Sequence, residues 1–105
     1  MTARVVTTVR ADQDIADAVA YYAGEGAHDA AFDLVDQLER AMRSLGAHPT
    51  LGSARLAVEI GIDEIRTLSL PRLPYVVIYT DDADAVRIHR VLHTSRDLGG
   101  VLRDG

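Results

Sequence analysis

The feature that most constrains the fold is an amphipathic pattern over residues 27–45. Apolar side chains recur there at intervals of three and four residues, and they are Ala31, Leu34, Leu38, Ala41 and Leu45, with Val35 and Met42 beside them. This spacing places them on one face of a helix, and that face must pack against another layer. Gly46 ends the pattern and Pro49 prevents its resumption. We therefore expect a helix from Ala27 to Leu45 with one buried face.

A shorter helix is expected just before it, from Asp12 to Ala23. Asp12 and Asp14 would lie in its first turn, where carboxylates interact favourably with the helix dipole. Apolar residues follow at helical spacing, and they are Ile15, Val19 and Tyr22. Gly24 and Gly26 interrupt the pattern. A connection of about three residues predicts that the two helices form an antiparallel hairpin.

Strand patterns flank this hairpin. They cover Ala3–Val9, Glu64–Leu70, Tyr75–Thr80 and Val86–His93. The nearly continuous apolar run at Tyr75–Thr80 suits a central strand that is buried on both faces. Residues 46–63, punctuated by glycine and proline, predict a ragged strand or a covering loop, and residues 95–105 form a short tail.

The expected fold is a single α+β domain over residues 1–105, with the order β-α-α-β-β-β. The helical hairpin should pack on a small, mainly antiparallel sheet. The residues expected to be buried are Ile15, Val19, Leu34, Leu38, Leu45, Val77 and Leu92. Core packing is also the expectation for Tyr22, for Phe32 and for one face of the Tyr75–Tyr79 strand. Tyr75 and Tyr79 should share a face, where single-stranded nucleic acid could stack, although the acids at 81–84 would repel phosphate.

Composition excludes several kinds of chemistry. The chain has no cysteine, which removes disulfides, thiolate metal sites and cysteine nucleophiles. All eleven basic residues are arginine, so a lysine base or Schiff base is excluded. Neither a membrane-spanning run nor a secretory signal is present, and we expect a cytoplasmic protein. No cofactor is expected, because no glycine pair has the spacing of a phosphate-binding loop.

The charge is unevenly distributed. The net charge is −5; residues 1–54 contribute four Arg and eight acids, or −4, and residues 55–105 contribute seven Arg and eight acids, or −1. Such a chain is not expected to bind DNA directly. The window of residues 87–96, however, contains Arg87, Arg90 and Arg96 and no acidic residue. This cluster predicts a solvated basic patch that meets an acidic partner segment, with internal pairing to Asp97 or Glu64 as the alternative.

Short segments from about Arg4 to Leu98 carry a family resemblance. They are Asp14-Ile15, Tyr21-Tyr22, Leu38-Glu39, His48-Pro49, Gly52 to Arg55, Glu64 to Leu68, Arg72 to Tyr79, Arg90 to His93 and Arg96-Asp97. In order and spacing the chain resembles the RelE/ParE superfamily of bacterial toxins, and within it the ParE branch. The resemblance implies the toxin of a type II toxin–antitoxin system, of the kind linked to plasmid stabilisation, which is neutralised by the C-terminal segment of a cognate antitoxin.

The superfamily implies two modes of action. RelE-like members cut mRNA on the ribosome, whereas ParE-like members inhibit DNA gyrase without nuclease activity. RNA cleavage needs a base, an acid and cations, and a set can be drawn from Arg66, Arg90, His93 and Arg96. The chain lacks lysine, however, and has no tyrosine after Tyr79. These departures favour a non-enzymatic gyrase inhibitor, with an endoribonuclease or a degenerate toxin that only binds antitoxin as the alternatives.

A metal site is not expected. His89 and His93 lie four residues apart on the last expected strand, so their positions are about 13 Å apart, which is too far for one ion. Asp81, Asp82 and Asp84 lack the spacing of a calcium-binding loop. With the antitoxin that the resemblance implies as the acidic partner, Arg87, Arg90 and Arg96 are the expected antitoxin contacts.

Overall fold

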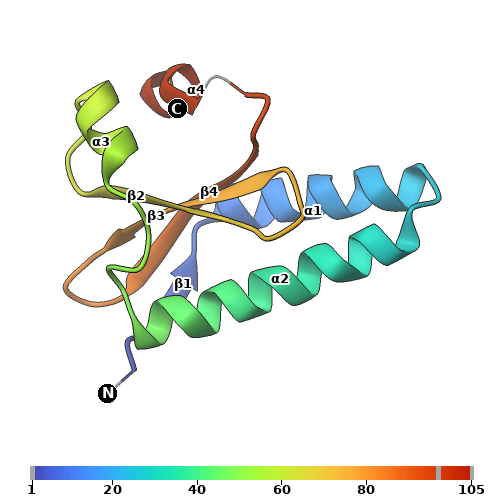
Figure 1. The fold of residues 1–105 in the computed structure, drawn as a ribbon, viewed down its shortest axis with the longest axis horizontal. Coiled ribbons are helices and arrows are strands. Elements are labelled where there is room, and N and C mark those ends of the chain that lie inside the picture. Colours follow the sequence, from blue (N-terminus) through green and yellow to red (C-terminus); the bar gives the residue numbers. More distant parts are fainter. Residues whose placement is uncertain (1, 97, 105) are drawn as a thin grey trace.

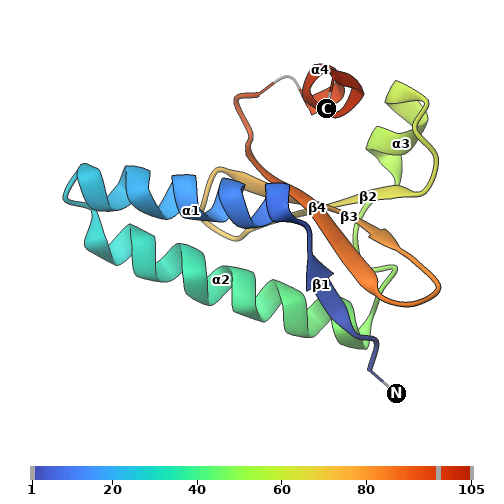
Figure 2. The ribbon, with the colours of Figure 1, turned by 180° about the vertical axis from the view of Figure 1, so that it is seen from behind.

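The structure, a computed structural model, describes residues 2–96 and 98–104 (Figure 1). In chain order the elements are β1 (Val5–Thr7), α1 (Val9–Gly24), α2 (His28–Ala47), α3 (Arg55–Ile60), β2 (Ile65–Ser69), β3 (Tyr75–Asp81), β4 (Val86–His93) and α4 (Leu98–Asp104). The expected α+β class is confirmed, with α1 and α2 as an antiparallel hairpin (Figures 1 and 2). No helix in the described ranges is long and apolar enough to cross a membrane.

The four strands form one sheet in the order β1-β4-β3-β2. β1 pairs with β4 in parallel, and the two other pairings, β2 with β3 and β3 with β4, are antiparallel. The last strand of the chain thus lies inside the sheet, between the first strand and β3. The α1–α2 hairpin covers one face, and the short helices α3 and α4 pack on the other.

β3 divides the core between these two faces. Tyr75, Val77 and Tyr79 face the hairpin, while Val76 and Ile78 face α3 and α4. This alternation confirms a central strand that is buried on both sides. Of the residues expected to be buried, five are buried and two are only partly buried: the five are Leu34, Leu38, Leu45, Val77 and Leu92, and the two are Ile15 and Val19.

The first strand is shorter than expected and the first helix starts earlier. The strand ends at Thr7, and α1 begins at Val9 rather than Asp12. The cause is Thr8, which has extended backbone angles and whose Oγ1 accepts a hydrogen bond from the Ala11 amide at 3.1 Å. A threonine in this position caps a helix, so its strand propensity is overridden.

Residues 46–63 contain a helix, and the strand or loop expected there is wrong. Leu56 and Ile60 are half-buried on one side of α3, whereas Val58 points to solvent. The apolar residues that suggested a strand therefore lie on a helix, where Leu56 and Ile60, four residues apart, share one side. Gly61, with φ of +70°, caps the end of α3 in the left-handed conformation.

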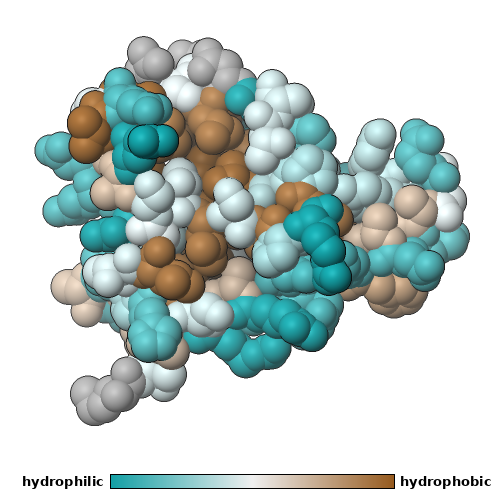
Figure 3. Space-filling model, viewed as in Figure 1, coloured by the Kyte–Doolittle hydropathy of each residue, from teal (hydrophilic) through white to brown (hydrophobic). Residues whose placement is uncertain are grey.

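The tail and one aromatic residue also differ from expectation. Leu98, Val101 and Leu102 form the apolar side of α4 and pack on the face of the sheet that α3 also covers. In the space-filling view, hydrophobic residues form a band that descends from the region of α4 across the sheet (Figure 3). Phe32 is not in the core: it is 75% exposed, because it lies two residues from the buried Leu34 and so on the opposite side of α2.

A buried hydroxyl fastens the loop after α2 to the sheet. Tyr79 Oη accepts a hydrogen bond from the Gly52 amide at 2.7 Å and donates one to the Pro49 carbonyl at 2.9 Å. Burial raises the pKa of this phenol, so it remains a neutral donor. The two hydrogen bonds require the backbone of Gly52 to lie directly against the tyrosine ring.

Gly52→Ala should therefore destabilise the fold. A Cβ atom there would lie 2.7 Å from both the Tyr79 side chain and the Thr67 carbonyl oxygen. We expect the free energy of unfolding to fall by about 2 kcal/mol or more, since overpacking of this kind displaces the backbone. Urea denaturation measures it. Gly24→Ala is the control, because a Cβ at Gly24 meets nothing within 4 Å; equal stability of the two variants would contradict the prediction.

Candidate functional site

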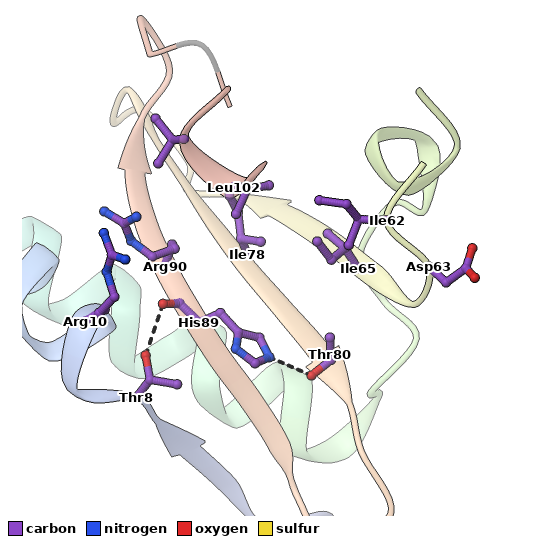
Figure 4. A pocket seen from close by; sticks show the side chains of 11 residues that line it. Thr8, Arg10, Ile62, Asp63, Ile65, Ile78, Thr80, His89, Arg90 and Leu102 are labelled. Carbon is purple, nitrogen blue, oxygen red and sulfur yellow. Dashed lines mark hydrogen bonds between the residues drawn. The ribbon is translucent and has the colours of Figure 1, made fainter. Parts of the chain in front are cut away.

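A β-bulge in β4 builds the polar part of the candidate site. Ile78 pairs with Arg90 and the next residue, Tyr79, pairs with Ile88, which leaves His89 as an extra residue in β4. Successive side chains of a regular strand point to opposite faces, but a bulge changes that alternation. Both His89 and Arg90 therefore line one cavity on the face of α3 and α4. Figure 4 shows them side by side on β4.

This cavity has a volume of about 370 Å³ and is apolar at one end and polar at the other. Ile62, Ile65 and Leu102 lie at the apolar end, toward α3 and α4 (Figure 4). At the polar end, His89 Nε2 and Thr80 Oγ1 are 2.8 Å apart in a hydrogen bond. Burial lowers the pKa of His89, which favours the neutral imidazole at pH 7. Because Arg10, Asp63 and Arg90 also line it, such a cavity can take a group that is apolar on one side and polar on the other.

Arg90 is committed to an internal ion pair. Its Nε and Nη2 atoms donate to the two carboxylate oxygens of Asp14 at 2.8 and 3.0 Å. The Asp14 carboxylate also accepts from the Val91 amide at 3.0 Å. The two charged side chains are only 13% and 14% exposed, and the Asp14 hydrogen bonds raise the pKa of Arg90 further. This guanidinium therefore holds α1 against β4.

Arg87 is also neutralised within the chain. It forms ion pairs with Asp82 and with Asp84, the latter at 2.9 Å. The hydrogen bonds from Arg87 lower the pKa of the Asp84 carboxyl. Arg87 and Arg90 thus follow the alternative of internal pairing, although their partners are Asp82, Asp84 and Asp14 rather than Asp97 or Glu64. Their role as antitoxin contacts stays a prediction. The acids that pair with them lie outside the window of residues 87–96, one of them 76 residues away in sequence.

Arg96 differs from the other two because it is exposed and has no ion pair within the described ranges. It lines a second cavity, of about 220 Å³, whose lining includes the rings of Tyr21, Tyr75 and His93 and the carboxylates of Asp14 and Asp17. The His93 ring meets the edge of the Tyr75 ring at a centroid distance of 5.3 Å, and its Nδ1 lies 2.8 Å from Ser95 Oγ. Asp97, the alternative partner considered for these arginines, lies outside the described residues.

The four residues considered for RNA cleavage are not gathered at one place. Arg66 donates to the Gly52 carbonyl at 2.9 Å and so belongs to the loop that Tyr79 fastens. Arg90 lines the larger cavity, whereas His93 and Arg96 line the smaller one. In the described part of the chain, no three side chains are arranged to hold a metal ion. The remaining exposed cation of the set, Arg96, is suited to binding a carboxylate or another anion.

Comparison with known proteins identifies a family and finds solved structures of similar fold. Residues 5–98 match the model of the family described as the ParE toxin of the type II toxin–antitoxin system parDE. Among solved structures, the chain is similar to one described as the chromosomal ParDE TA system from P. aeruginosa. Identity to it is 18%, with a TM-score of 0.71 over 88% of this chain and 96% of that chain, which establishes a common fold. No curated protein matches.

The internal position of Arg90 generates a prediction about stability. Arg90→Ala leaves the Asp14 carboxylate buried without its cation, so we expect the free energy of unfolding to fall by about 2–3 kcal/mol. Arg40→Ala, which removes an exposed ion pair with Asp36, should cost less than about 0.5 kcal/mol. Urea denaturation of both variants compares them. Similar small losses in the two variants would show that Arg90 has no structural role.

Proposed function

Because the chain belongs to the ParE toxin family, we propose that it acts by binding and inhibiting DNA gyrase and is neutralised by a cognate antitoxin. Its membership of that family, over residues 5–98, is the observation that carries the proposal. Gyrase works on chromosomal DNA, so the proposed place of action is the cytoplasm. Direct, specific binding of this acidic chain to DNA is not part of the proposal.

The side chains support binding over RNA cleavage. A nuclease must place a base, an acid and cations within reach of one phosphate. Arg66 and Arg90 are instead held by carbonyl and carboxylate groups of the fold. The sequence has no lysine that could replace them. A protein that works by occupying a surface of its target needs none of these groups.

An antitoxin contact at Arg96 is the part of the predicted basic patch that the geometry still supports. The guanidinium is exposed beside the cavity that Tyr21, Tyr75 and His93 line. A partner segment with an apolar side chain in this cavity and a carboxylate on Arg96 would satisfy both features. Arg87 and Arg90 already have carboxylate partners, so they contribute less to such an interface.

The proposal for the target predicts the outcome of two assays run side by side. The purified chain should inhibit the supercoiling activity of DNA gyrase and should leave mRNA intact in a translating ribosome. Addition of the antitoxin should restore supercoiling. Cleavage of mRNA in the ribosomal A site that His93→Ala abolishes would assign the protein to the nuclease branch instead.

The proposal for the antitoxin predicts a loss of affinity in Arg96→Ala. A charge-assisted hydrogen bond contributes about 1.5–3 kcal/mol when it is partly desolvated, so the affinity should fall about ten- to a hundredfold. Isothermal titration of the toxin with its antitoxin measures this, and the thermal stability of the free toxin should not change. Arg55→Ala, which removes another exposed arginine, on α3, is the control. Unchanged affinity in Arg96→Ala would eliminate Arg96 as a contact.

A further inference from the structure

The tip of the helical hairpin projects beyond the sheet. Figures 1 and 2 agree that the end of α1 and the start of α2 extend past the strands, and in Figure 3 they form a separate lobe. The buried residues of α2 begin only at Leu34, six residues after the helix starts. The first turns of α2 therefore present their outer side to solvent.

Two large apolar side chains lie on this outer side. Phe32 is 75% exposed and Val35 is 40% exposed. They are three residues apart on one helix and so form neighbouring parts of its surface. Aromatic residues that occupy the centre of a surface patch are the ones that contribute most to protein–protein binding. The folded chain gains nothing from Phe32, because the side chain lies opposite the buried face of α2.

Two carboxylates flank the apolar residues along α2, and His28 lies one turn before Phe32. Asp29 lies one turn before Phe32, and Glu39 lies one turn after Val35. Both are exposed, and no ion pair is formed by either within the described ranges. A third acid, Asp36, is paired with Arg40. We call Asp29, Phe32, Val35 and Glu39 the hairpin patch: an aromatic centre with an acidic rim.

We propose that the hairpin patch is the surface that docks on the target enzyme, against a basic region of the kind that binds DNA. This inference rests on the proposed function, in which the target is DNA gyrase. An enzyme that holds duplex DNA presents lysine and arginine to the phosphates, and the acidic rim of the patch complements such a surface. Phe32 supplies the apolar anchor at the centre.

Other occupants of the patch fit less well. A second copy of this chain would bring its own Asp29 and Glu39 against the same carboxylates, which repel one another. The antitoxin segment proposed above is acidic, because it is expected to reach Arg96, and it would be repelled for the same reason. The contacts with the target and with the antitoxin are thus separated by charge: a basic partner at the hairpin patch and an acidic partner at Arg96.

The test uses the full-length chain in a gyrase supercoiling assay. Phe32→Ala should raise the half-inhibitory concentration at least about tenfold, as expected when a central aromatic is removed. The double variant Asp29→Asn/Glu39→Gln should also weaken inhibition, and its inhibition should depend less on salt than that of the wild type. The antitoxin affinity and the thermal stability of each variant should equal those of the wild type.

Matched controls lie on α3. Val58→Ala removes an apolar side chain that is 84% exposed, and Glu59→Gln removes an exposed acid, and neither should change inhibition. Wild-type inhibition in Phe32→Ala and in the double variant would overturn the proposal while leaving gyrase as the target. So would a loss of antitoxin affinity in these variants, or an equal loss of inhibition in the α3 controls. Failure of the wild-type chain to inhibit gyrase would instead refute the proposed function, and this inference with it.

Discussion

The open edge of β4 is the constraint on which the rest of the structure depends. β1 pairs with only three residues of β4, Val86 to Ile88, so beyond Ile88 the backbone of β4 has a strand, β3, on one side only. Unpaired backbone groups in a protein interior are costly, and α1 supplies their partners. The Thr8 amide and hydroxyl donate to the carbonyls of Ile88 and His89, and the Asp14 carboxylate accepts from the Val91 amide. Thr8 and the first turns of α1 thus satisfy backbone groups of β4 that β1 does not reach.

The hydrogen bonds between the start of α1 and β4 also position residues of the candidate site. Because Thr8 binds the carbonyl of His89, the helix contacts β4 at the bulge, where two consecutive side chains turn toward the larger cavity. The Asp14 carboxylate accepts hydrogen bonds from the Val91 amide and from the Arg90 side chain, so the charge of Arg90 is neutralised beside β4. The two faces of the sheet are covered differently: a hairpin of two long helices packs on one face, and the two short helices on the other border the cavity that His89 and Arg90 line.

Much of the fold could be predicted from local patterns, and the parts that could not depend on contacts distant in sequence. The helical period from Ala31 to Leu45 and the apolar run at β3 were sufficient to place the hairpin and the central strand. The period-two spacing of Leu56, Val58 and Ile60 suggested a strand. In a segment of six residues, however, this spacing does not distinguish a strand from a short helix. The spacing of Leu98, Val101 and Leu102 does indicate a helix, although Gly99 and Gly100 obscure it. No local sequence pattern indicates that Arg90 forms an ion pair with Asp14, or that the start of α2, with Phe32, projects beyond the sheet.

The interior position of the last strand also governs when the protein can fold during its synthesis. β1 emerges from the ribosome first, yet its partner residues, Val86 to Ile88, are made about eighty residues later. Until then the hairpin has only the apolar face of β2 and β3 to cover, and Thr8 and Asp14 lack the β4 backbone groups with which they form hydrogen bonds. Closure of such a long chain segment is slow compared with helix formation. A chain that terminates before Val86 therefore lacks the strand between β1 and β3, and we expect it to stay unfolded and open to proteolysis.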